Sequence, residues 1–209
     1  GVHAVLTQAD LAPFGVTMLS FFLGPVEVAM TPLADGRVAY VGHPVALVIA
    51  DDRYLAEDAA SLVVVDYAEE AAVVTLDDAR LGPRVHPDTD DNVAALMGEE
   101  ESDAALEALL TGAPHRVSQS IRHQRIAQSP METRGVVASL QGESELLVHI
   151  TCAGPQLVAR WLTLALDRPG LSVRVVAKDV GGSFGLKNHP WMEEVSAILA
   201  AMLLRRPVK

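Results

Sequence analysis

Residues 38–67 read VAYVGHPVALVIADDRYLAEDAASLVVVDY, and the patterns within this stretch decide the fold. Residues 38–50 contain two runs of high β propensity, which Gly42, His43 and Pro44 interrupt. Glycine and proline break regular strand pairing, so we expect a strand, a tight turn and a second strand here.

A helix is expected next. The aspartates at 51–52 can cap exposed helix N–H groups. Three apolar residues then fall on one helical face, namely Leu55, Ala59 and Leu62. The run over 63–67 has strong β propensity again. The order strand, helix, strand predicts a helix packed on a small sheet, which places the chain in the α+β class.

The rest of the chain is read in the same way. Residues 80–102 are rich in Pro, Gly, Asp and Asn and show no period, so we expect a linker or a long surface loop. The other expected elements are a strand at 1–6, a helix at 104–110, a hairpin at 135–152, a helix from Pro155, a strand at 171–179, a helix at 191–204 and the opening of a strand at 207–209.

Composition excludes several classes of protein. With 209 residues, half of them apolar, the chain can fill one or two cores. A net charge of -11 and only 16 basic residues argue against a nucleic-acid partner. No apolar run approaches the roughly 20 residues of a membrane span. The first residues show no signal peptide and already read as a strand, so the natural chain is expected to begin upstream.

The single cysteine, Cys152, excludes an internal disulfide framework and a cysteine-based iron-sulfur or zinc site within these residues. At the end of an apolar strand it is expected to be a small buried hydrophobe. A reducing, cytoplasmic location fits this cysteine usage. The seven histidines show no HxH or HxxxH spacing, so no metal ligands are predicted. Glu132 and Arg134 are expected to form an ion pair or a hydrogen-bond network.

The glycine-rich stretch at 180–187, VGGSFGLK, lies between an expected strand and an expected helix. Glycines let backbone N–H groups approach an anion or a metal oxygen closely, and they can form a concave nest of donors. A site for a cofactor is therefore one interpretation, and a simple connecting loop is the other. Lys187 has no preceding glycine and is followed by Asn188, so the stretch is not a Walker A loop.

Three segments carry a resemblance to a known family. Residues 41–67 resemble the small hammerhead domain of the large subunits of xanthine dehydrogenase, aldehyde oxidase and carbon monoxide dehydrogenase. Residues 129–135, SPMETRG, are similar to the family's PMEPRG segment. Residues 179–187, followed by Glu193–Glu194 and by RPVK at 206–209, look like its D-GGGFG-K block with the later glutamate and PVK.

The resemblance implies two domains, an N-terminally truncated hammerhead-like α+β domain over 1–81 and the first part of a molybdopterin-binding domain over 82–209. It implies a subunit that holds a molybdenum-molybdopterin cofactor, in a dinucleotide form. Such enzymes hydroxylate an aldehyde or an N-heterocycle with water as the oxygen source. The implied partners are an iron-sulfur small subunit with [2Fe-2S], a medium subunit with FAD and the remainder of the molybdopterin-binding subunit.

The resemblance also implies cofactor-binding residues, which are Gly181, Gly182, Phe184 and Gly185. The alternative for Phe184 is a core aromatic residue under the loop. Ala153 replaces a glutamine whose amide can contact the molybdenum centre in the family.

Two further departures concern the substrate and the catalytic base. Asn188 replaces the glutamate that purine-oxidising relatives use to bind substrate. The family's catalytic glutamate lies downstream of these residues, so no catalytic residue is predicted and the chain alone is expected to be inactive. The alternative function is a noncatalytic scaffold, or a degenerate homologue without cofactor.

Overall fold

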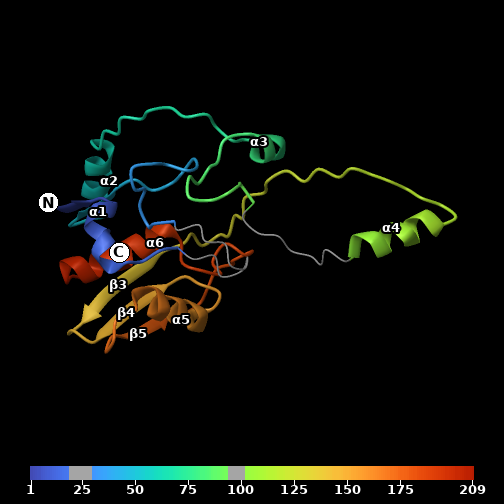
Figure 1. Ribbon diagram of the computed structural model, residues 1–209. Coiled ribbons are helices and arrows are strands. Elements are labelled where there is room, and N and C mark those ends of the chain that lie inside the picture. Colours follow the sequence, from blue (N-terminus) through green and yellow to red (C-terminus); the bar gives the residue numbers. More distant parts are fainter. Residues whose placement is uncertain (19–29, 94–101) are drawn as a thin grey trace.

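The computed structural model describes residues 1–18, 30–93 and 102–209. Its strands are β1 (Val2–Leu6), β2 (Leu47–Ala50), β3 (Val136–Gln141), β4 (Glu145–Ile150) and β5 (Ser172–Val176). Its helices are α1 (Gln8–Leu11), α2 (Arg53–Ser61), α3 (Leu76–Leu81), α4 (Ser102–Gly112), α5 (Pro155–Leu166) and α6 (Met192–Leu204), with a 3-10 helix over Ala12–Phe14. Helices combined with two small sheets confirm the α+β class (Figure 1).

The first sheet has two strands, because β1 pairs antiparallel with β2 and places Val5 opposite Val48. Helix α2 then begins after Asp52, whose Oδ1 accepts a hydrogen bond from the Leu55 N–H at 2.9 Å. This bond satisfies one of the N–H groups that the first helical turn leaves without a partner. The predicted strand at 1–6 and the predicted capped helix are both confirmed.

Two of the predicted strands in the deciding stretch are wrong. The strand expected before Gly42 does not form, while the expected turn does, with the His43 N–H donating to the Tyr40 carbonyl at 3.2 Å, and the second strand begins only at Leu47. Residues 63–67 have no regular structure, and the Val64 residue is 85% exposed. High β propensity means that residues fit a pleated, half-buried surface. Within the described ranges no strand lies beside 63–67, so this run has neither a pairing partner nor a face to bury.

The second sheet has three strands in the order β3–β4–β5. The strands β3 and β4 form the predicted hairpin, and Gly142 in the turn has φ +64°, a conformation that favours glycine. Pro155 opens α5 at its first turn, as predicted, and the helix carries the chain over to β5, which runs parallel to β4. The C-terminal strand prediction is met only by a single bridge between Val208 and Ala138.

The core is centred on α6, in which every residue from Val195 to Met202 is buried. Ile198, Leu199 and Ala200 are completely buried, although they point in different directions around the helix. One side of α6 packs on β3, and Leu11 and Leu33 from the first part of the chain are buried in the same cluster. The two ends of the chain therefore share one hydrophobic core.

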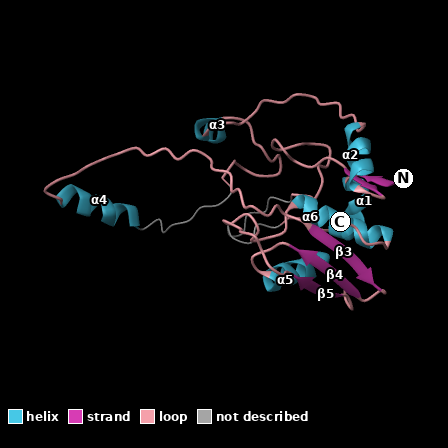
Figure 2. Cartoon of the chain, turned by 180° about the vertical axis from the view of Figure 1, so that it is seen from behind, coloured by secondary structure: helices cyan, strands magenta, loops and turns pink. Residues whose placement is uncertain are grey.

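Helix α4 confirms the predicted helix at 104–110 but lies apart from both sheets in the two opposite views (Figure 1, Figure 2). Residues 82–93 and 113–131 form no helix or strand. The predicted surface loop over 80–102 is thus confirmed for 82–93, while residues 94–101 lie outside the described part.

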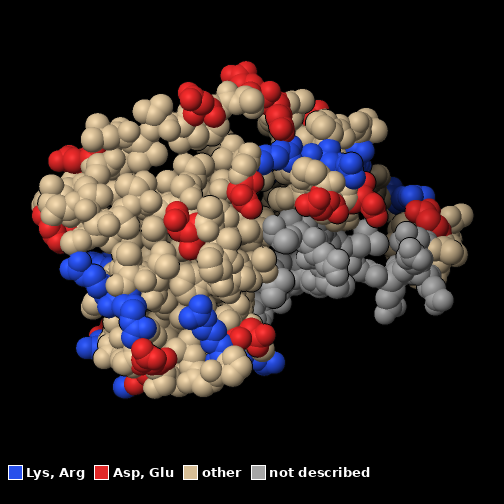
Figure 3. Space-filling model, turned by 60° about the vertical axis from the view of Figure 1, so that its left-hand side comes forward, with Lys and Arg blue, Asp and Glu red and all other residues tan. Residues whose placement is uncertain are grey.

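The surface carries both signs of charge. On the face in Figure 3, basic side chains occur in small groups among acidic ones. Among the described helices, none is both long and apolar enough to cross a membrane.

The substitution Leu199→Ala tests the central role of α6. Removing this fully buried side chain should lower the free energy of unfolding by roughly 2–5 kcal/mol, because the cavity it leaves cannot close completely. The control Leu203→Ala lies on the same helix at 41% exposure and should cost about 1 kcal/mol or less. Chemical denaturation followed by circular dichroism measures both, and equal losses would contradict the proposed position of the core.

Candidate functional site

The glycine-rich loop joins β5 to α6 and has an unusual backbone. Gly182, Phe184 and Gly185 all have positive φ, at +92°, +50° and +88°. Backbone of this kind can turn neighbouring N–H groups into a concave surface that binds anions. The N–H groups of residues 182–185 have no acceptor within the described part of the chain. They are therefore available to a ligand.

The C-terminal end of the loop is held by several hydrogen bonds. The Leu186 N–H donates to the Ser183 carbonyl at 2.9 Å, and the Lys187 N–H donates to the Ser183 Oγ at 3.1 Å. The Leu186 carbonyl accepts from the Trp191 Nε1–H at 2.6 Å, and the Lys187 carbonyl accepts from the Ala153 N–H at 2.9 Å. These bonds connect the loop to α6 and to the start of α5.

The N-terminal end of the loop is bound to Glu132. Its Oε2 accepts from the Gly181 N–H at 2.8 Å and from the Lys187 Nζ at 2.8 Å. These two hydrogen bonds hold the pKa of the Glu132 carboxyl below its ordinary value, and the bond from Lys187 has the larger effect. Gly181 thus differs from the other three predicted cofactor-binding residues, because its N–H is already engaged.

Arg134 belongs to a neighbouring contact. Its guanidinium pairs with the Glu193 carboxylate and lies 4.8 Å from the centre of the Trp191 ring. Cation–π contacts of this kind are weakly stabilising. Glu132 and Arg134, expected to form an ion pair or a network, do not pair with each other. Each binds a different side chain, Glu132 that of Lys187 and Arg134 that of Glu193, so the expected contact between the two is wrong.

Glu194 is a buried acid at the start of α6, with 4% of its surface exposed. Its Oε2 accepts from the Trp191 N–H at 2.9 Å, whereas its Oε1 has no hydrogen-bond partner among the described residues. Burial raises the pKa of Glu194 to about 7, although this hydrogen bond and nearby Arg134 act in the opposite direction. Glu194 is marked in the sequence by its motif only, within the Glu193–Glu194 pair of the family block, and the apolar helix that follows it is the signal that the acid is buried.

The remaining predicted positions surround the loop. Cys152 is buried, as predicted, and burial raises the pKa of its thiol. Ala153 is exposed and contacts the end of the loop through its backbone alone. Asn188 is exposed directly after Lys187, and Phe184 is 73% exposed. The alternative of a core role for Phe184 does not agree with that exposure.

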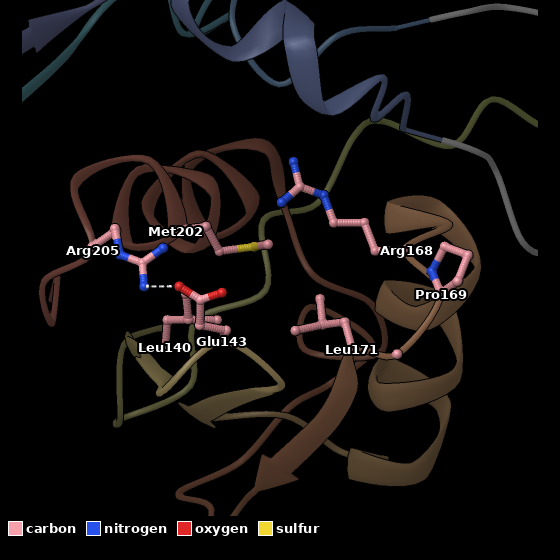
Figure 4. A pocket seen from close by; sticks show the side chains of 8 residues that line it. Leu140, Glu143, Arg168, Pro169, Leu171, Met202 and Arg205 are labelled. Carbon is pink, nitrogen blue, oxygen red and sulfur yellow. Dashed lines mark hydrogen bonds and ion pairs between the residues drawn. The ribbon is translucent and has the colours of Figure 1, made fainter.

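Two pockets lie near the second sheet. One pocket, of about 310 Å³, is lined by Glu132 beside the loop and by His149, Lys178 and Asp179. The other, of about 300 Å³, contains Arg168, which faces the pocket from the end of α5 (Figure 4). It also contains the pair of Arg205 and Glu143. Arg205 caps the C-terminal end of α6, so this second pocket lies about 20 Å from the loop along the helix.

The loop fits a group that carries anionic oxygens. It offers a row of N–H donors, and a Cβ atom built on Gly185 would meet open space. Glycine keeps that space free for a close approach by a ligand. No group of three or more His, Cys, Asp or Glu side chains within the described residues is placed to hold a metal ion directly.

The chain matches two protein families. Residues 85–209 match the molybdopterin cofactor-binding domain. Residues 1–71 match the a/b hammerhead domain of aldehyde oxidase and xanthine dehydrogenase. Together these matches include the loop, the Glu132 segment and both sheets.

Individual proteins are also similar to this chain along its whole length. The carbon monoxide dehydrogenase large chain of Hydrogenophaga pseudoflava is 35% identical over 100% of this chain and 27% of its own length. The nicotine 6-hydroxylase large subunit of Paenarthrobacter nicotinovorans is also 35% identical, over 100% of this chain and 26% of its own length. The structure of quinoline 2-oxidoreductase from Pseudomonas putida 86 superimposes with a TM-score of 0.85 at 30% identity, covering 100% of this chain and 27% of that one. The chain therefore spans about a quarter of the length of these relatives.

Glu194→Gln should make stability less dependent on pH. In the unfolded chain this carboxyl loses its proton near pH 4.5, while in the folded chain it keeps the proton up to about pH 7. The wild-type free energy of unfolding therefore falls as pH rises between these values. Glutamine stays neutral and its amide oxygen can still accept from the Trp191 N–H. Above pH 7 the free energy of unfolding of Glu194→Gln should therefore exceed that of wild type by on the order of 3 kcal/mol.

Urea denaturation at pH 4, 6 and 8 measures this difference. Glu107→Gln, an exposed acid on α4, is the control and should stay within about 0.5 kcal/mol of wild type throughout. Parallel curves for wild type and Glu194→Gln would show that Glu194 is ionised in the folded chain.

Proposed function

The chain belongs to the family of molybdenum hydroxylase large subunits, and from this premise we propose that it forms part of the cofactor-binding subunit of an oxidoreductase. The proposed reaction is the hydroxylation of an aldehyde or an N-heterocycle, with water as the source of oxygen. The observation that carries the proposal is the row of free N–H donors on the loop at 182–185, within the segment that matches the molybdopterin cofactor-binding domain.

The part of this chain in the reaction is to bind and orient the cofactor. When bound, the molybdenum cofactor supplies two-electron redox chemistry. The loop would hold it through the N–H groups of Gly182, Ser183, Phe184 and Gly185, and the exposed Phe184 ring would cover one side. Donors fixed in advance by the fold stabilise negative charge without a cost of reorganisation.

The proposed substrate class rests on the names of two relatives and on the uncharged side chain of Asn188. Nicotine 6-hydroxylase and quinoline 2-oxidoreductase are named for N-heterocycles. Asn188 is uncharged and exposed beside the loop, where a glutamate would favour a purine. We therefore favour an aldehyde or a non-purine heterocycle as substrate.

The proposal extends to the domains and partners. A boundary near residue 81 is supported by the irregular stretch over 82–93, which leaves the hammerhead-like part over 1–81 and the molybdopterin-binding part over 82–209. The relatives are named large chains or subunits, which supports the presence of partner subunits. We further propose, from the family resemblance, that these partners carry [2Fe-2S] and FAD and that the cofactor has a dinucleotide form. The buried, unpaired Cys152 is consistent with the proposed cytoplasmic location.

Elemental mass spectrometry tests the proposal on the protein purified from its native host with whatever copurifies. We expect molybdenum near one atom per chain, together with iron and flavin. Intact partners without molybdenum would contradict the enzyme assignment and favour the scaffold alternative, to which Ala153 points because it lacks the amide donor.

Phe184→Ala tests the loop itself. The ring is 73% exposed, so its removal should change the free energy of unfolding by no more than about 0.5 kcal/mol. The turnover of an aldehyde or N-heterocycle oxidised by the wild-type complex should fall about tenfold or more, because a cofactor that is slightly misplaced reacts slowly. Tyr54→Ala, an equally exposed aromatic on α2, should leave both quantities unchanged. Wild-type turnover by Phe184→Ala would place the cofactor elsewhere.

A further inference from the structure

Both ends of the glycine-rich loop are bound to the same oxygen atom. Oε2 of Glu132 accepts from the N–H of Gly181, where the loop begins, and from the Nζ of Lys187, where it ends. Both distances are 2.8 Å. The loop over 181–187 is therefore closed into a ring by one carboxylate on another segment, 55 residues away from Lys187 in sequence.

The burial of Lys187 indicates that this contact is a built feature of the fold. The Lys187 side chain has no exposed surface, while the Glu132 side chain is 35% exposed. A buried ammonium group requires a charged or strongly polar partner. Glu132 is the one acceptor of its Nζ within the described residues. A surface ion pair, in contrast, can form and break at little cost.

The backbones of the two segments also touch. The Glu132 N–H donates to the Gly181 carbonyl at 3.4 Å. A Cβ atom on Gly181 would lie 2.6 Å from the Glu132 Cβ, which is too close for any side chain. Glycine is therefore required at 181 for this approach to Glu132, and the reason differs from the positive φ at Gly182 and Gly185.

The pattern of hydrogen bonds separates anchoring groups from free groups. The N–H groups of Gly181, Leu186 and Lys187 are all used to fix the loop. Those of residues 182–185 between them have no acceptor in the described part of the structure. Closing the loop at one atom limits the directions in which the free donors can point, and such preorganisation reduces the cost of binding.

We propose that Glu132 is a positioning residue that sets the direction of the free N–H donors by clamping both ends of the loop. It acts through the Gly181 N–H and the Lys187 ammonium and need not touch the cofactor itself. The inference rests on the proposed function, because it takes the cofactor as the group that those donors meet.

The experiment uses the complete complex purified with its partner subunits, in wild type and in four variants. Glu132→Ala removes the clamp, and Glu132→Gln keeps an amide oxygen that can accept both bonds. Lys187→Met fills the buried volume without the ammonium and leaves the bond to Gly181 intact. Glu143→Gln is the control, since Glu143 pairs with Arg205 at a similar distance of 2.9 Å at the other end of α6.

Two measurements are made on each protein. Hydrogen-deuterium exchange resolved to single residues over 180–187 reports on the loop with or without cofactor. Electron paramagnetic resonance after partial reduction with dithionite reports on the surroundings of the molybdenum and needs no substrate. Molybdenum content is measured beside them.

In Glu132→Ala the N–H groups that fix the loop, those of Gly181, Leu186 and Lys187, should exchange at least tenfold faster. The resonance of the molybdenum that remains bound should differ from wild type. Glu132→Gln should restore most of both readings. Lys187→Met should speed exchange at Leu186 and Lys187 but not at Gly181. A residue that only stabilised the fold would lower the molybdenum content and leave the spectrum of the remaining loaded molecules unchanged.

Each failure has a separate signature. Wild-type exchange and a wild-type spectrum in Glu132→Ala would overturn the positioning role while the proposed function stands. Wild-type protein without molybdenum would overturn the proposed function, whatever the exchange data show. If Glu132→Ala does not accumulate, Lys187→Met decides the question, and wild-type exchange across its whole loop would overturn the clamp.

Discussion

Every residue of helix α6 from Val195 to Met202 is buried, so water is excluded from all sides of this stretch. The sheet can cover only one of its sides, through β3. The other side is covered from the beginning of the chain, where Leu11 and Leu33 are buried and where the Pro32 carbonyl accepts from the Ser196 Oγ at 3.2 Å. This requirement brings Leu11, Pro32 and Leu33 to α6, which lies at the centre of the hydrophobic core.

The site uses that rigidity. The loop with the free donors leads directly into α6, and Trp191 at the helix N-terminus holds the Leu186 carbonyl. Two acids follow in the first turn, where the helix dipole favours negative charge. Glu193 is half-exposed and pairs with Arg134, whereas Glu194 is buried and its pKa is raised to about 7. Two neighbouring acids thus have different surroundings, because only Glu193 reaches water.

Local patterns in the sequence predicted most of the elements but not the contacts between them. The hairpin around Gly142, the proline start of α5 and the cap at Asp52 are each encoded within a few residues, and all three are confirmed. The run over 63–67 was predicted as a strand from propensity alone and is irregular, because a strand depends on a neighbour that propensity does not supply. The loop was visible as a motif, but the bond from Lys187 to Glu132 joins residues 55 apart and has no local signature.

The shared core also sets the order in which the protein can become complete during its synthesis. Pro32 and Ser196, which bond across that core, are 164 residues apart. At translation rates of 5–20 residues per second, the first segment waits roughly ten to thirty seconds before α6 leaves the ribosome. During that interval Leu11 and Leu33 have no permanent cover, so the nascent chain presents an apolar surface of the kind that chaperones bind. The segment around Pro32 is thus fully covered only after a part of the chain 164 residues further on has been made.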